Sequence, residues 1–119
     1  MQIFKLTEVP SVDGERELRV EGELDLAVAN RLQEALDGID AKRVLIDLSS
    51  CEFIDSTGIA LIVRAWQRLD NGENGRSLVL CSQNDQVRRV LEITGLELSI
   101  PVHSTRDEAM AALTAQPPA

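Results

Sequence analysis

The chain contains little of what catalysis and covalent cross-linking commonly require. Its 119 residues include one histidine, His103, and two cysteines, Cys51 and Cys81. Two cysteines make no disulfide framework and their spacing fits no zinc motif, so we expect reduced thiols, no metal and no other cofactor. The sequence has no Walker phosphate loop, no GxGxxG after a strand and no GxSxG elbow. A serine-histidine-aspartate triad has only His103 to recruit, so catalysis is the least favoured function.

Aromatic residues and long apolar runs are also scarce. The aromatics are Phe4, Phe53 and Trp66, and there is no tyrosine, so the core must be built from Leu, Val, Ile and Ala. The longest apolar run, residues 58–63, is far short of the roughly 20 residues of a membrane span. No apolar stretch follows Met1 as it does in a signal peptide. We therefore expect a cytoplasmic protein without a membrane partner.

Positive charge is in deficit, and the deficit is uneven. The net charge is −8; residues 1–40 hold four basic and ten acidic groups, and residues 41–119 hold eight and ten. A protein that binds nucleic-acid phosphates needs the opposite field, and anionic membranes are disfavoured for the same reason. The acidic first third suits either a basic protein partner or simple solubility, and the charge pattern leaves both open.

The apolar pattern predicts one domain over residues 1–114, followed by a flexible tail at 115–119. The predicted strands are residues 3–7, 17–21, 43–48, 77–81 and 100–102. The predicted helices are residues 26–36, 57–69, 85–94 and 106–114. Strands that alternate with helices indicate an α/β fold with a mixed, mostly parallel sheet of 4–5 strands. The first two strands form an N-terminal hairpin, and residues 49–53 are expected to be a loop.

Ser56 stands where this loop meets the second helix. A serine here can cap the helix by accepting a hydrogen bond from a free backbone amide, which stabilises by about 1 kcal/mol relative to alanine. The alternative is a modification site. Free amides at a helix N-terminus accept anions, so a phosphate on Ser56 would add about −1.5 to −2 charges without unfolding the domain.

The helix that follows is apolar around most of its circumference. A surface helix normally keeps one polar face. Either both faces of this helix are buried, or Ile59 or Leu61 is exposed and forms a docking patch beside Ser56. The sequence leaves both alternatives open.

Three segments together resemble the STAS domain of the anti-sigma-factor antagonist family. They are Gly22-Glu23-Leu24-Asp25, the run from Asp47 to Gly58 (DLSSCEFIDSTG), and the run from Val87 to Leu96 (VRRVLEITGL). The resemblance covers nearly the whole chain in the right order. It implies a STAS-type fold of successive β-α units, with neighbouring strands in sequence order and helices mainly on one face.

The resemblance also implies a mechanism of partner switching in bacterial transcription regulation. In such families the unphosphorylated antagonist binds a serine-kinase anti-sigma factor and thereby frees the sigma factor. The kinase then phosphorylates the serine after the signature aspartate, the antagonist dissociates, and a serine phosphatase restores it. That serine corresponds to Ser56, with Thr57 as a minor acceptor.

The same resemblance assigns the partner-binding residues. Asp25 lies on a loop of the same face, and Asp55, Thr57 and Gly58 flank Ser56. Ile59 and Leu61 complete the predicted contact set, on the alternative in which the apolar second helix exposes a docking patch. The chain is expected to be a monomer or a weak homodimer.

Two other functions compete with the switch. A constitutive STAS interaction module in a scaffold or transport-regulatory complex predicts binding that is indifferent to charge at Ser56. A small nucleotide-binding protein or enzyme predicts a rise in melting temperature with ligand.

Overall fold

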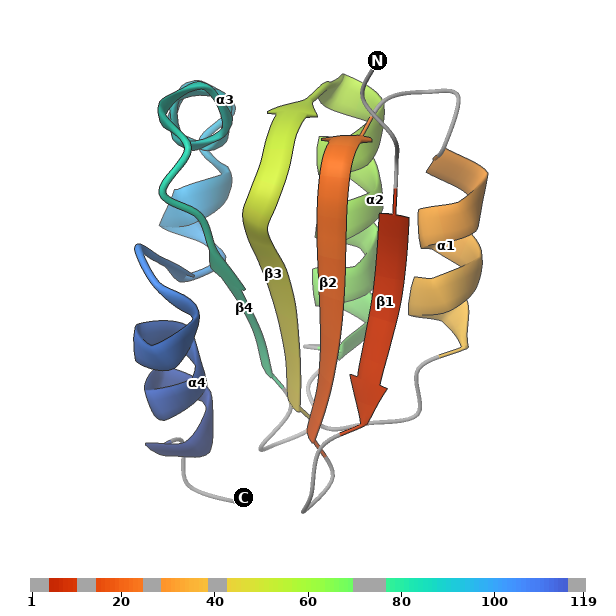
Figure 1. The fold of residues 1–119 in the computed structure, drawn as a ribbon, viewed down its shortest axis with the longest axis vertical. Coiled ribbons are helices and arrows are strands. Elements are labelled where there is room, and N and C mark those ends of the chain that lie inside the picture. Colours follow the sequence, from red (N-terminus) through yellow and green to blue (C-terminus); the bar gives the residue numbers. More distant parts are fainter. Residues whose placement is uncertain (1–4, 11–14, 25–28, 39–42, 70–76, 116–119) are drawn as a thin grey trace.

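A computed structural model describes residues 5–10, 15–24, 29–38, 43–69 and 77–115 (Figure 1). Within these residues, five strands form one sheet in the order β1-β2-β3-β4-β5. The strands are β1 (Lys5–Pro10), β2 (Glu15–Leu24), β3 (Arg43–Ile54), β4 (Ser77–Cys81) and β5 (Val102–His103). The helices are α1 (Ala29–Asp37), α2 (Ser56–Leu69), α3 (Asp85–Ile93) and α4 (Arg106–Ala115), with a 3₁₀ turn η2 at Leu96–Leu98.

The sheet is mixed, as predicted. β1 pairs antiparallel with β2, while β2, β3, β4 and β5 pair parallel in sequence order. Parallel neighbours cannot be joined by a tight hairpin, so each parallel connection carries a crossover helix. This topology confirms the α/β fold class and the N-terminal hairpin. Residues 11–14, which connect the two strands of the hairpin, lie outside the described ranges.

Three helices cover one face of the sheet and α4 covers part of the other. The larger core cluster joins α1, α2 and α3 to the even-numbered strand residues Leu18, Val44, Ile46 and Leu80 among others. The smaller cluster joins α4 to the other face, and its buried members are Leu45, Val79, Cys81, Ala109 and Leu113. Side chains alternate between the faces of a strand, so β3 and β4 are apolar on both. Helices therefore lie mainly on one face, as expected.

A buried carboxylate joins β2 to the start of α4. Glu17 is 0% exposed. Arg106 donates through Nη2 to Oε1 at 2.7 Å and through Nε to Oε2 at 2.9 Å, and Arg19 Nε donates to Oε2 at 2.8 Å. The hydrogen bonds from Arg106 hold the pKa of Glu17 below its usual range although burial opposes this. The sequence pattern did not predict this contact.

The predicted loop at residues 49–53 is wrong. β3 continues through Ile54 because β2 also continues, and the two pair at Glu21–Ser50 and Glu23–Phe53. The serines of this segment are exposed, so their polar side chains are compatible with a strand. Two register shifts against β2 mark β-bulges here, and bulges bend a strand. Figure 1 shows β3 bent along its length.

Helix ends follow the local signals in the sequence. Asn84 caps α3 by accepting from Val87 N at 3.0 Å. Gly95 ends that segment with φ of +75°, a left-handed conformation that favours glycine. Thr105 caps the N-terminus of α4, and its Oγ1 accepts from Glu108 N at 3.1 Å as in a capping box. β4 has the predicted bounds, whereas β5 begins two residues later than predicted.

No helix within the described residues is long and apolar enough to cross a membrane. No group of three or more His, Cys, Asp or Glu side chains that could hold a metal ion occurs in this part of the chain. Cys51 and Cys81 are free thiols, and both are buried.

Candidate functional site

Asp55 caps helix α2. Its Oδ1 accepts from Thr57 N at 3.0 Å and from Gly58 N at 3.1 Å. Its backbone carbonyl accepts the first intrahelical bond, from Ile59 N at 3.0 Å. These contacts define an N-cap residue, and aspartate is among the residues that stabilise this position most. Asp55 reaches this place because β3 extends to Ile54 and the helix begins immediately after it.

Ser56 is therefore the first residue of α2 and does not cap it. Its side chain is exposed. Its hydroxyl has no hydrogen-bond partner among the described residues, since Asp55 supplies the side-chain bonds to the first turn. The interpretation of Ser56 as a helix cap is wrong, because the preceding aspartate already occupies that role. Within the described part of the chain, the Ser56 hydroxyl makes no side-chain contact that stabilises the fold.

The backbone amides in the first turn of α2 are less available to bind an anion than the sequence suggested. Two of them, those of Thr57 and Gly58, donate to the Asp55 carboxylate. A phosphate on Ser56 would therefore lie beside a carboxylate that already holds the anion site of the helix. The like charges repel, and the phosphate gains those amides only if Asp55 leaves the cap.

Of the two alternatives for Ile59 and Leu61, the structure shows burial, and the exposed docking patch does not form. Their exposed fractions are 8% and 6%, and both belong to the core cluster. Leu61 and Leu36 line one hollow between α2 and α1, and Ile59 and Ile100 line another. Helix α2 is thus packed on more than one side, which explains why its sequence is apolar around most of its circumference.

The exposed side of α2 consists of different residues. Ala60, Arg64 and Gln67 are exposed, and Ala60 and Arg64 follow Ser56 at spacings of four and eight. Residues four apart share one face of a helix, so Ser56 and Ala60 lie on the same exposed face of α2. The spacing of four residues from Ser56 was the signal in the sequence that would have placed Ala60 on the same helix face.

Phe53 is a second surface feature that the sequence pattern did not single out. It lies three residues before Ser56 and is 44% exposed. Of the predicted contact set, Asp55 and Thr57 are half-buried and Gly58 is buried. Asp25 lies outside the described residues. Ser56 is therefore the most exposed member of the contiguous group.

Comparison with known proteins identifies the family. The STAS domain family matches residues 4–109. The chain belongs to the STAS domain family. An anti-sigma-B factor antagonist of Listeria monocytogenes is 34% identical over 92 residues, covering 75% of this chain and 79% of the relative.

Solved structures of STAS proteins agree with this fold. An anti-sigma factor antagonist from Mycobacterium paratuberculosis superposes with a TM-score of 0.82 at 25% identity, covering 92% of this chain and 95% of the other. The unphosphorylated form of the antagonist SpoIIAA gives 0.72 at 20% identity, with 94% and 96% covered, and supports the fold alone. The Listeria relative is named for antagonism of an anti-sigma factor, and the sequence of this chain likewise favours a binding protein over an enzyme.

Proposed function

We propose that this STAS protein is an anti-sigma-factor antagonist switched by phosphorylation of Ser56. In its unphosphorylated form it binds a serine-kinase anti-sigma factor and so frees the sigma factor. The kinase transfers the γ-phosphoryl group of ATP to Ser56 Oγ, with ADP as leaving group and the hydroxyl proton passing to a base. A serine phosphatase hydrolyses the phosphoester and restores binding.

The observation that carries this proposal is the state of the Ser56 hydroxyl. It is exposed and has no hydrogen-bond partner among the described residues, while Asp55 supplies the cap. A kinase can therefore approach it without breaking a contact of the fold. The similarity to named antagonists supports the same assignment.

The negative charge of a phosphoryl group on Ser56 would account for release of the partner. The phosphoryl group brings about −1.5 to −2 charges to a surface that a partner must desolvate. Asp55 repels it from the helix amides, so the phosphate stays directed outward, toward the partner. The fold itself loses no described hydrogen bond, so the modification changes binding and leaves the domain folded.

Capture from lysate of the source organism tests the proposal. Wild type, Ser56→Asp and Ser104→Asp are immobilised, and the retained proteins are identified by mass spectrometry. Ser104 is exposed and lies just before the cap of α4, so this variant adds one negative charge near another helix start. We expect wild type and the Ser104 variant to retain a serine kinase of the anti-sigma class that the Ser56 variant loses.

The kinase found in this way is then incubated with ATP and each protein. We expect one phosphate on wild type, mapped to Ser56, and none on Ser56→Ala. Retention of the same partners by wild type and Ser56→Asp would contradict the switch and favour a constitutive module in a scaffold or transport complex.

The remaining parts of the proposal concern the chain as a whole. We propose a single STAS domain over residues 1–114 with a tail at 115–119, acting in the cytoplasm as a monomer or weak homodimer. Asp25, Asp55, Thr57 and Gly58 are proposed to line the partner contact around Ser56. Ile59 and Leu61 are not part of it, since both are buried.

A further inference from the structure

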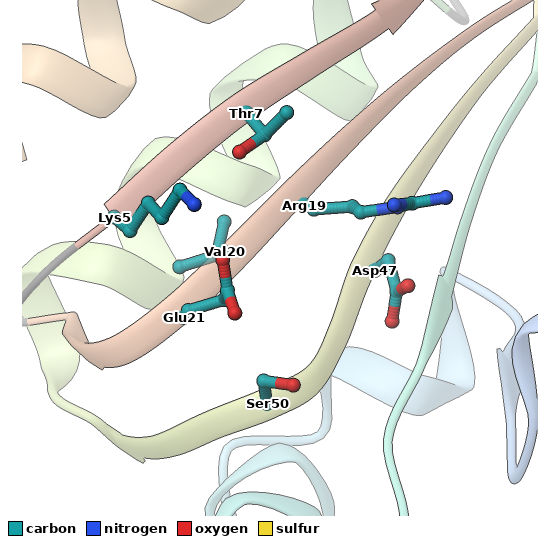
Figure 2. A pocket seen from close by; sticks show the side chains of 7 residues that line it. All are labelled: Lys5, Thr7, Arg19, Val20, Glu21, Asp47 and Ser50. Atoms are coloured by element: carbon teal, nitrogen blue, oxygen red, sulfur yellow. The ribbon is translucent and has the colours of Figure 1, made fainter.

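The sheet carries a polar pocket on the face opposite α1, α2 and α3. Its volume is about 440 Å³, within the roughly 300–1,000 Å³ that small-molecule sites occupy. Figure 2 shows the side chains of β1, β2 and β3 that line it. They are Lys5, Thr7, Arg19, Val20, Glu21, Asp47 and Ser50.

A bulge in β3 brings two polar side chains to this pocket. Arg19 pairs with Asp47 and Glu21 pairs with Ser50, so β3 uses one more residue than β2 over this stretch. The extra residue bends β3 and changes which side chains face the pocket. Asp47 and Ser50 consequently line the same hollow although they are three residues apart.

Asp47 is a mostly buried carboxylate, and among the described residues only its Oδ1 has hydrogen-bond partners. It is 8% exposed. Its Oδ1 accepts from Ser49 N at 2.9 Å and from Cys81 Sγ at 3.2 Å. Oδ2 has no hydrogen-bond partner among the described residues. Oδ2 belongs to a side chain that lines the pocket, and a carboxylate oxygen can accept a hydrogen bond from a ligand that enters it.

The Cys81 thiol, which donates to Asp47 Oδ1, keeps that oxygen occupied. Burial, together with the hydrogen bond to Asp47, raises the pKa of Cys81 to about 12. Cys81 therefore stays protonated at neutral pH and occupies Oδ1 as a donor. Oδ2 is the oxygen that remains for a ligand.

The cationic side chain of Lys5 lies at the other side of the pocket from Asp47. Figure 2 shows Lys5 and Thr7 on β1 at one side, and Asp47 and Ser50 on β3 at the other. Lys5 lies directly opposite Glu21 in the β1–β2 register, yet no ion pair joins the two among the described contacts. The second cation, Arg19, is held by Glu17 at 2.8 Å.

We propose that this pocket binds a small zwitterion, with its ammonium group held by Asp47 and Glu21 and its carboxylate by Lys5 and Thr7. Adjacent strands lie about 4.8 Å apart, so β1 and β3 are separated by about 10 Å. A ligand that joins their side chains needs its two charges several bonds apart. An ω-amino acid or a dipeptide has this form.

Titration of ¹⁵N-labelled protein with ω-amino acids of increasing length tests this. The probes are glycine, 4-aminobutyrate and 6-aminohexanoate, with butylamine and hexanoate as analogues that carry one charge. We expect saturable shifts at the amides of Thr7, Val20 and Ser50, with affinity rising with chain length. Each single-charge analogue should bind at least about tenfold more weakly, because a hydrogen bond between charged groups is lost.

Two variants and one control decide the outcome. Lys5→Gln and Asp47→Asn should each weaken 6-aminohexanoate at least about tenfold. Arg89→Gln, which removes an exposed charge on α3, should leave its affinity unchanged. Lys5 is exposed, so its variant remains decisive if Asp47→Asn fails to fold.

The proposal is overturned if no ω-amino acid produces saturable shifts at the three pocket amides. It is also overturned if Lys5→Gln binds 6-aminohexanoate as tightly as wild type. Either result is separable from the fate of the Ser56 switch, because this titration involves no protein partner and no phosphorylation.

Discussion

Separate alanine substitutions of the cap residue Asp55 and of the neighbouring Ser56 distinguish the roles of the two side chains. Asp55→Ala removes both side-chain hydrogen bonds to the first turn of α2, at Thr57 N and Gly58 N. Loss of an N-cap typically costs about 1 kcal/mol and reaches about 2 kcal/mol in favourable contexts. Ser56→Ala removes an exposed hydroxyl without a described partner, so its cost should lie within about 0.5 kcal/mol.

Urea unfolding followed by far-ultraviolet circular dichroism measures both costs. We expect Asp55→Ala to lower the free energy of unfolding by about 1–2 kcal/mol. For a domain of this size that corresponds to a fall of roughly 4 °C or more in Tm. Asp55→Asn keeps an acceptor at the cap and should lose much less. A larger cost for Ser56→Ala than for Asp55→Ala would refute the assignment of the cap.

Three further predictions follow from the same structure. Ile59→Ala should lower the free energy of unfolding in urea by about 2–5 kcal/mol because it leaves a cavity in the core. Ala60→Asp should change that free energy by no more than about 0.5 kcal/mol but should weaken capture of the kinase. Equal stability of the two variants would contradict the burial of Ile59 and the exposure of Ala60. Arg106→Gln should cost about 1–3 kcal/mol at pH 7, the value for a buried pair being reduced because Arg106 is partly exposed. The pKa of Glu17 is lowered from 4.5 in the folded state. The stabilisation is therefore present above 4.5 and is lost as pH falls through the folded pKa, so the stabilities of the variant and wild type should draw together in acid. A difference that did not shrink at all as the pH fell would contradict this. Gly95→Ala should lower the free energy of unfolding by about 1–2 kcal/mol because alanine is strained at a φ of +75°. No steric clash adds to this cost, since the new Cβ would lie 3.8 Å from Leu98, an ordinary contact distance. An unchanged urea midpoint would show that the position is not strained.

The strand and helix order could be predicted because each element carries its own period. Continuous apolar runs at residues 43–48 and 77–81 predicted strands covered on both faces, and the structure confirms both. Local signals at Asn84, Gly95 and Thr105 also predicted helix ends that the structure confirms. Such signals act over a few residues and need no knowledge of the tertiary fold.

The errors concern features that depend on neighbouring strands. Ser49 and Ser50 have the composition of a loop, yet they stay in β3 because β2 extends alongside them. That extension sets where the strand ends, and hence makes Asp55 the cap in place of Ser56. The burial of Ile59 and Leu61 likewise depends on how α1 and η2 pack against α2, which no local pattern specifies. The bond from Arg106 to Glu17 joins residues 89 apart in the sequence.

The central claim is that Ser56 controls partner binding, and one affinity measurement tests it most directly. The kinase identified by capture is titrated against unmodified protein and against protein phosphorylated at Ser56. We predict that phosphorylation weakens binding at least about a hundredfold, since like charges in an interface cost several kcal/mol. Both forms should give the same far-ultraviolet spectrum. Equal affinity for the two forms would contradict the switch.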